Sequence, residues 1–202
     1  MQESFEPMYP AELYTKRPNK NALLSPLYDW TFKELFTQET EDSNLALKSF
    51  ISAVLNREVT KVTLKNNEPP KETKKQKNMT FDVSVKFNNG ELADIELQTQ
   101  KENYDFGARA EIQVARLLTN NAKKGKNWKS EKVYQISVLN FQYKNNDKKE
   151  LRWYNMADSC GEKLTERLNI IFLDLVTIRK NYQKSRLKSF LHWKNGDSSF
   201  RM

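Results

Sequence analysis

The stretch at residues 81–100, FDVSVKFNNGELADIELQTQ, constrains the fold of this chain more than any other. Its first half alternates large apolar residues with polar ones, which is the period of two expected of a β-strand. If the central Asn-Asn-Gly forms a three-residue loop with its glycine in the left-handed conformation, Phe87 pairs with Glu91 in a β-hairpin. Asp82 then lies opposite Glu96, on the same face, with the two Cβ atoms roughly 4.5–5.5 Å apart.

Two carboxylates held this close repel each other unless a cation lies between them. A hard divalent ion such as Mg²⁺ is the obvious candidate, because it takes oxygen ligands from one or two carboxylates together with water and phosphate. Two alternatives stay open. The face that carries Asp82 and Glu96 can be an ordinary solvated surface, and a two-residue Asn89-Gly90 loop would turn Glu96 to the opposite side of the sheet.

The net charge of the chain favours a polyanionic partner. The 202 residues are enough for one domain with a substantial core, and 11 Phe, 8 Tyr and 4 Trp are typical of a packed globular protein. Lys and Arg number 34 against 26 Asp and Glu, which gives a formal charge of +8. Nucleic acid is the simplest polyanion that such a surplus would bind.

Several classes of protein are excluded by composition. The single cysteine, Cys160, allows neither an intramolecular disulfide nor a cysteine-based zinc site. The single histidine, His192, lies in FLHWK outside any recognisable nuclease motif, which counts against a histidine-based nuclease. The N-terminal residues do not resemble a signal peptide, and no apolar segment reaches the roughly 20 residues needed to span a bilayer. A cytoplasmic protein without membrane association is expected.

Hydrophobic periodicity predicts a mixed α/β fold. The expected order is a helix beginning at Ser25-Pro26, a helix at 43–55, a strand at 59–64, the hairpin, a helix at 106–121, strands at 133–143, 151–156 and 168–176, and a helix at 186–194. A three-strand meander followed by a helix and a further strand suits an α/β sandwich. The lysine-rich residues 65–79 are expected to be a loop, either a solvated linker or an arm that touches phosphate.

Four stretches carry a resemblance to a known family: residues 24–36, residues 45–57, the Asp-turn-Ile-Glu-X-Gln pattern within 81–98, and Phe106-Gly107-Ala108-Arg109. They resemble the PD-(D/E)XK nuclease superfamily, in particular the PD-(D/E)XK nuclease family transposases, or recombination-promoting nucleases. The resemblance spans about residues 24–195. It implies a restriction-endonuclease-like αβββαβ core, a mixed sheet flanked by helices. The implied division is an irregular arm at 1–24, one nuclease-like domain at 25–195 and a tail at 196–202.

The same resemblance assigns roles to individual residues. Asp82 and Glu96 correspond to the metal-binding acidic pair, with Mg²⁺ or Mn²⁺ as the ion. Gln98 stands where the wider superfamily has a lysine, and the transposase group usually has glutamine there. Because glutamine forms hydrogen bonds but carries no charge, either metal ions or another cationic side chain must help to stabilise the charge that builds on phosphorus. Arg109 is the first candidate for that task, and Lys33 is the second.

Two of these assignments have alternatives. Arg109 can instead form an ordinary surface ion pair with Glu111 or Asp105. On the first helix a further acidic metal ligand is expected, and either Asp29 or Glu34 can supply it. We take Asp29 as the predicted ligand.

The resulting hypothesis is a metal-dependent DNA endonuclease that acts in recombination, in mobile-element transfer or in defence. The backbone of the DNA would contact a set of lysines, namely Lys33, Lys74, Lys75, Lys77, Lys123, Lys124 and Lys126. The main alternative is a catalytically inactive nucleic-acid-binding or interaction protein that retains the fold. An integrase-type transposase would need three acids on a different fold, and no third position is visible. A homodimer is a further hypothesis.

Overall fold

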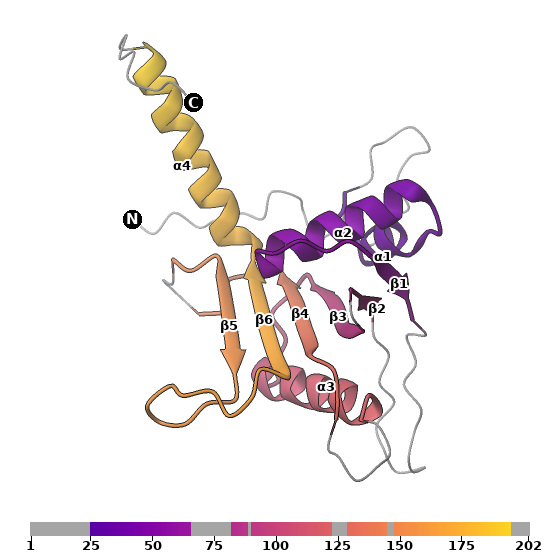
Figure 1. Ribbon diagram of the computed structural model, residues 1–202. Coiled ribbons are helices and arrows are strands. Elements are labelled where there is room, and N and C mark those ends of the chain that lie inside the picture. The colour runs from indigo at the N-terminus through magenta and orange to yellow at the C-terminus, as the bar shows by residue number, and fades with distance from the viewer. Residues whose placement is uncertain (1–24, 66–81, 89, 123–128, 145–147, 195–202) are drawn as a thin grey trace.

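The computed structural model describes residues 25–65, 82–88, 90–122, 129–144 and 148–194, with the side chains of α4 described as far as Ser185 (Figure 1). The elements in chain order are α1 (Asp29–Thr37), α2 (Glu41–Leu55), β1 (Val62–Leu64), β2 (Val83–Phe87), β3 (Glu91–Gln98), α3 (Phe106–Asn120), β4 (Val133–Leu139), β5 (Leu151–Asn155), β6 (Leu168–Asp174) and α4 (Leu175–Lys194). In this part of the chain no helix is both long and apolar enough to cross a membrane.

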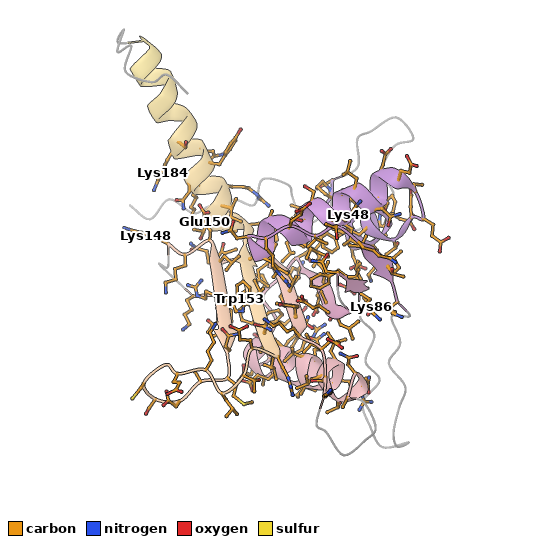
Figure 2. The ribbon with its side chains drawn as sticks, viewed as in Figure 1. Lys48, Lys86, Lys148, Glu150, Trp153 and Lys184 are labelled. Atoms are coloured by element: carbon orange, nitrogen blue, oxygen red, sulfur yellow. The ribbon has the colours of Figure 1, made fainter. Side chains whose placement is uncertain are left out.

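The strands form one mixed sheet in the order β1-β2-β3-β4-β6-β5. Strands β3, β4 and β6 run parallel to one another, whereas β1, β2 and β5 are each antiparallel to their neighbours. The predicted mixed sheet flanked by helices is confirmed. The edges of the sheet are β1 and β5, so Lys86 on β2 and Trp153 on β5 lie toward opposite edges (Figure 2).

Helices cover both faces of the sheet (Figure 1). Against one face, α1 and α2 pack apolar side chains onto alternate residues of the hairpin, and this core includes Phe32, Phe36, Leu47, Ile51, Val83, Val85, Ala93 and Ile95. Against the other face, α3 packs onto β4 and β6, and that core includes Ala110, Val114, Leu117, Val133, Ile170 and Phe172. Polar residues of β2 and β3 therefore alternate onto the α3 side of the sheet.

The hairpin has the predicted register. Phe87 pairs with Glu91 and Val83 pairs with Ile95. Gly90 has a φ of 106°, a backbone conformation in which glycine has no steric penalty, and its N–H donates to the Phe87 carbonyl at 3.1 Å. The two-residue loop, which would have reversed the face of Glu96, is not what forms.

Several predicted boundaries are wrong. The first helix begins at Asp29 and not at Ser25-Pro26, because Tyr28 keeps an extended backbone. The last predicted strand ends at Asp174, whose carboxylate accepts from the Thr177 N–H at 2.8 Å and thereby caps α4. That helix consequently starts at Leu175, well before the predicted residue 186. The predicted arm at 1–24, tail at 196–202 and most of the 65–79 loop lie outside the described residues.

Candidate functional site

The register of the hairpin brings Asp82 and Glu96 together. Asp82 directly precedes β2, and continuing the pairing of Val83 with Ile95 by one residue places it beside Glu96. The Leu97 N–H donates to Asp82 Oδ2 at 3.4 Å, which ties the residue to β3. The negative charge of Asp82 also raises the pKa of Glu96, as expected of two carboxylates a short distance apart.

Glu96 is buried beneath α3 and its carboxylate is held on both oxygens. Arg109 forms an ion pair with Oε1, and the side-chain amides of Gln113 and Gln135 donate to Oε2 at 3.0 and 3.4 Å. Burial raises the pKa of Glu96 above its ordinary value, although the charge of Arg109 opposes this shift. Three side chains therefore hold the Glu96 carboxylate in one orientation.

Asp82 is more open than Glu96, with a side chain 18% exposed against 4%. The Lys33 ammonium of α1 lies 3.2 Å from Asp82 Oδ1 and 2.9 Å from Asp29 Oδ2. Burial raises the pKa of Asp82, Lys33 opposes that shift, and the charge of Asp29 adds to it. Of the two acids considered on α1, Asp29 thus lies in the electrostatic neighbourhood of Asp82, whereas Glu34 accepts a hydrogen bond from Gln38 at 3.1 Å.

Arg109 reaches the acidic pair from the first turn of α3. Its guanidinium donates hydrogen bonds to the Glu96 carboxylate and to the Tyr104 hydroxyl. It also lies 5.7 Å from the centre of the Tyr104 ring. The alternative of a surface ion pair with Asp105 or Glu111 is wrong. Asp105 instead caps α3 by accepting from the Ala108 N–H at 3.1 Å.

Gln98 lies at the end of β3, two residues beyond Glu96 and on the same face of the strand. Its side-chain N–H donates to the Gln100 carbonyl at 3.3 Å and the residue is half-buried. The predicted role in orienting an attacking water stays a prediction. Among the predicted DNA-binding lysines, Lys33 belongs to the site itself, and a group of six lies outside the described residues, namely Lys74, Lys75, Lys77, Lys123, Lys124 and Lys126.

Three polar residues of the site were not anticipated from sequence. Asp94 is fully buried, neither of its oxygens accepts a well-formed hydrogen bond, and burial together with the charge of Glu96 raises its pKa well above the ordinary value. Gln113 and Gln135 are buried as well. A signal was present for Gln135, since it is a large polar residue in the middle of the apolar strand VYQISVL.

The family of the chain follows from a comparison with family models. The model described as PD-(D/E)XK nuclease family transposase matches residues 26–195, which is most of the sequence and all of the site described above. The chain belongs to this family. Among curated proteins, no match to the chain is found. The mixed six-stranded sheet flanked by helices agrees with a restriction-endonuclease-like fold.

PD-(D/E)XK nucleases generally depend on a divalent metal ion. Carboxylate oxygens such as those of Asp82 and Glu96 are donors that a hard divalent cation accepts. The described residues contain no group of three or more His, Cys, Asp or Glu side chains able to hold a metal. Within them, Asp82 and Glu96 form a set of two neighbouring carboxylates. Such a set suits Mg²⁺, which keeps several waters and takes only one or two protein carboxylates.

Proposed function

We propose that this PD-(D/E)XK family member is a metal-dependent DNA endonuclease that hydrolyses phosphodiester bonds. The observation that supports it most directly is the convergence of Asp82 and Glu96, from the two limbs of one hairpin, beside the cations Lys33 and Arg109. Acidic and basic groups reach this point from three separate elements, α1, the hairpin and α3. A surface hairpin with a merely solvated face would not gather them.

Asp82 and Glu96 would hold the metal through their carboxylate oxygens. When bound, Mg²⁺ would offset the negative charge that develops on the phosphate and on the leaving oxygen during hydrolysis. Asp82, the more exposed of the two, is the carboxylate that solvent reaches more readily. Glu96 is kept in one orientation by Arg109 and Gln113, so its position is fixed before any ligand binds.

The remaining residues supply charge and orientation. The Arg109 guanidinium is 38% exposed, so it can pair with Glu96 and still present donors to a phosphate oxygen. The Lys33 ammonium contributes a second positive charge at the opening, and the joint pull of Asp29 and Asp82 outweighs burial and raises its pKa. Gln98, uncharged and at the rim of the site, would accept a hydrogen bond from a water beside the phosphate.

A second function has one observation in its favour. Lys33 and Arg109 already pair with Asp82 and Glu96 within the chain, and such internal neutralisation also suits a nucleic-acid-binding protein that retains the nuclease fold without activity. The two functions predict different results for DNA cleavage, because only the enzyme cuts DNA and needs the Glu96 carboxylate to do so.

Nicking of supercoiled plasmid with Mg²⁺ tests the proposal. We expect Glu96→Ala and Asp82→Ala each to lower the nicking rate by at least ~10²-fold. Without either carboxylate, the metal ion that would offset the charge at phosphorus is no longer held. Glu162→Ala, an exposed glutamate in the connection between β5 and β6, is the matched control and should cut like the parent. A Glu96→Ala protein as active as the parent would disprove the site, and a parent that binds DNA but never cuts it would favour the binding protein.

A further inference from the structure

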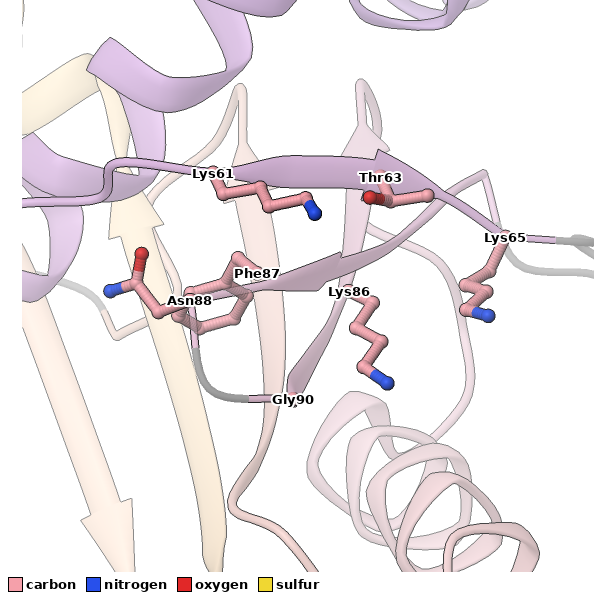
Figure 3. Close-up of a pocket in the computed structure, with 7 residues that line it drawn as sticks. All are labelled: Lys61, Thr63, Lys65, Lys86, Phe87, Asn88 and Gly90. Carbon is pink, nitrogen blue, oxygen red and sulfur yellow. The ribbon is translucent and has the colours of Figure 1, made fainter.

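Three lysines gather at the edge of the sheet next to the hairpin loop. Lys61 and Lys65 flank β1 on either side of Thr63, so the three side chains share one face of the strand. Thr63 pairs directly with Lys86 of β2, which places Lys86 on that face too. Figure 3 shows the three lysines around a shallow hollow of about 400 Å³ whose wall also includes Asn88 and Gly90. None of these lysines was among those predicted to bind DNA.

Backbone hydrogen bonds fix the strands under this lysine surface (Lys61, Lys65 and Lys86). The Lys65 N–H donates to the Ser84 carbonyl at 2.8 Å, and the Lys61 carbonyl accepts from the Asn88 N–H at 3.0 Å. All three lysines are exposed, and within the described residues none of them forms an ion pair or a side-chain hydrogen bond. Glu131 lies beyond Gly90 at the margin of the surface, near the Lys86 stem.

The lysine surface shares its side of the sheet with the candidate site. Asp82, Ser84 and Lys86 alternate with the core residues Val83, Val85 and Phe87, so they lie on the opposite face of β2 from that core. Lys86 is four residues from Asp82 along β2, a span of roughly 13 Å at about 3.3 Å per residue. That span corresponds to a few nucleotides of a DNA strand, at about 3.4 Å per nucleotide along the helix axis.

We propose that Lys61, Lys65 and Lys86 bind the sugar–phosphate backbone of the nucleic acid a few nucleotides from the phosphate that would be cleaved beside Asp82 and Glu96. This inference rests on the proposed function for the location of the cut, but it concerns binding alone. Lysine ammonium groups and the Thr63 hydroxyl contact phosphate without reading bases. The surface offers no arginine for bidentate base recognition, so the contact holds the strand in register and carries no sequence preference.

Salt dependence of binding separates a phosphate contact from a general loss of charge. The triple variant Lys61→Gln, Lys65→Gln, Lys86→Gln is compared with Lys48→Gln, Lys148→Gln, Lys184→Gln, which removes the same charge from side chains on α2, before β5 and on α4 (Figure 2). Affinity for a short DNA duplex is measured in EDTA from 50 to 200 mM KCl. For three phosphate contacts, the slope of log K against log salt should fall by about 2.7 in the first variant, at about 0.9 per contact.

Each outcome decides the question. A smaller slope for the Lys61, Lys65, Lys86 triple alone, restored when the three positions are arginine, supports the proposal. Equal effects of the two triples, or no DNA binding by the parent, overturn it. The proposal is also overturned if the Lys61, Lys65, Lys86 triple variant keeps the parental slope and begins to self-associate. In that case the lysines would serve to prevent edge strands of separate molecules from pairing. A parent that binds with the expected slopes yet never nicks plasmid would sink the proposed function and leave this inference standing.

Discussion

Glu91 shows how a single side chain can join three elements. It lies at the start of β3, where Arg57, just after α2, donates to both carboxylate oxygens and the Tyr134 hydroxyl of β4 donates at 2.8 Å. Burial by itself would raise the pKa of Glu91, but the hydrogen bonds from Arg57 and Tyr134 outweigh it and the pKa lies below the ordinary value. The ionised form of Glu91 is therefore more stable, relative to the protonated form, in the folded protein than in the unfolded chain.

This shift predicts how stability depends on pH. Because the folded pKa is depressed, the stabilisation by Glu91 is complete above the unfolded value of about 4.3 and is lost as the pH falls through the lower folded pKa. At pH 7 we expect Glu91→Gln to lower the free energy of unfolding by about 1 kcal/mol, a modest figure because Arg57 is 38% exposed and partly screened. The gap between parent and variant should close below pH 4 in urea titrations.

The exposed pair of Lys132 and Glu166 provides the comparison for Glu91. Its carboxylate is 2.6 Å from the lysine, yet the glutamate side chain is 60% exposed. Surface pairs of this kind contribute little to stability. Glu166→Gln should therefore leave the urea midpoint close to that of the parent at every pH. A Glu91→Gln gap that stays constant from pH 3 to pH 8 would contradict the assigned ionisation.

The residues of the site differ in how far sequence could identify them. Asp82, Glu96 and Arg109 stood out by strand parity and by resemblance, and the structure brings them together. Gln113 did not, because a glutamine one helical turn beyond Arg109 looks like any polar helix residue until the helix is docked. Asp94 was equally hidden. Its parity matched that of Glu96, but complete burial depends on how α3 covers the sheet, which no local pattern states.

At the scale of elements, turn chemistry predicted more than boundaries did. The Asn-Asn-Gly loop fixed the hairpin register, and apolar periodicity located α3 to within a residue of its observed end at Asn120. The start of α4 is not predicted because LNIIFLDLV is mostly apolar and carries neither helix nor strand periodicity. The capping aspartate, Asp174, marks the change from strand to helix, and the predicted strand at 168–176 extends past it.

The cap of α3 gives a prediction at this scale. Asp105 accepts from the Ala108 N–H, and Gly107 leaves room for it, since a Cβ on Gly107 would lie 3.2 Å from Asp105 Oδ1. Asp105→Ala should cost about 1 kcal/mol in the free energy of unfolding, whereas Asp105→Asn, another good capping residue, should cost much less. Urea denaturation at pH 7 measures both. Equal losses would mean that the charge of Asp105, and not its capping bond, stabilises the helix.

The site as a whole exists only because helices from opposite sides of the sheet meet at one end of the hairpin. Lys33 comes from α1, which packs with α2 on one face, while Arg109 and Gln113 come from α3 on the other (Figure 1). The family resemblance predicts that both cations lie near the acidic pair, whereas no pattern within the helices does. Nothing in residues 25–37 by themselves specifies that Lys33 ends 3.2 Å from Asp82.

Asp82 and Glu96 come together only in the folded chain, so a metal ion bound by both, as the proposed function requires, should stabilise the whole molecule. A ligand that binds only the folded state at ten times its Kd adds about 1.4 kcal/mol to the free energy of unfolding. For a domain of this size that corresponds to a rise in Tm of roughly 3–6 °C. We expect such a rise for the parent in a Mg²⁺ or Mn²⁺ titration without DNA, followed by differential scanning calorimetry at constant ionic strength.

The same titration on variants shows where the ion binds. Asp82→Asn and Glu96→Gln each remove one carboxylate while keeping the shape of the side chain, so the metal-induced rise in Tm should shrink to a small fraction of the parental value. Glu162→Gln, which removes an equal charge from an exposed position, should keep the full rise. Since each protein is compared with itself at zero metal, any intrinsic change in stability cancels. A full rise in Glu96→Gln would place the ion away from the hairpin and remove the chemical basis for cleavage at Asp82.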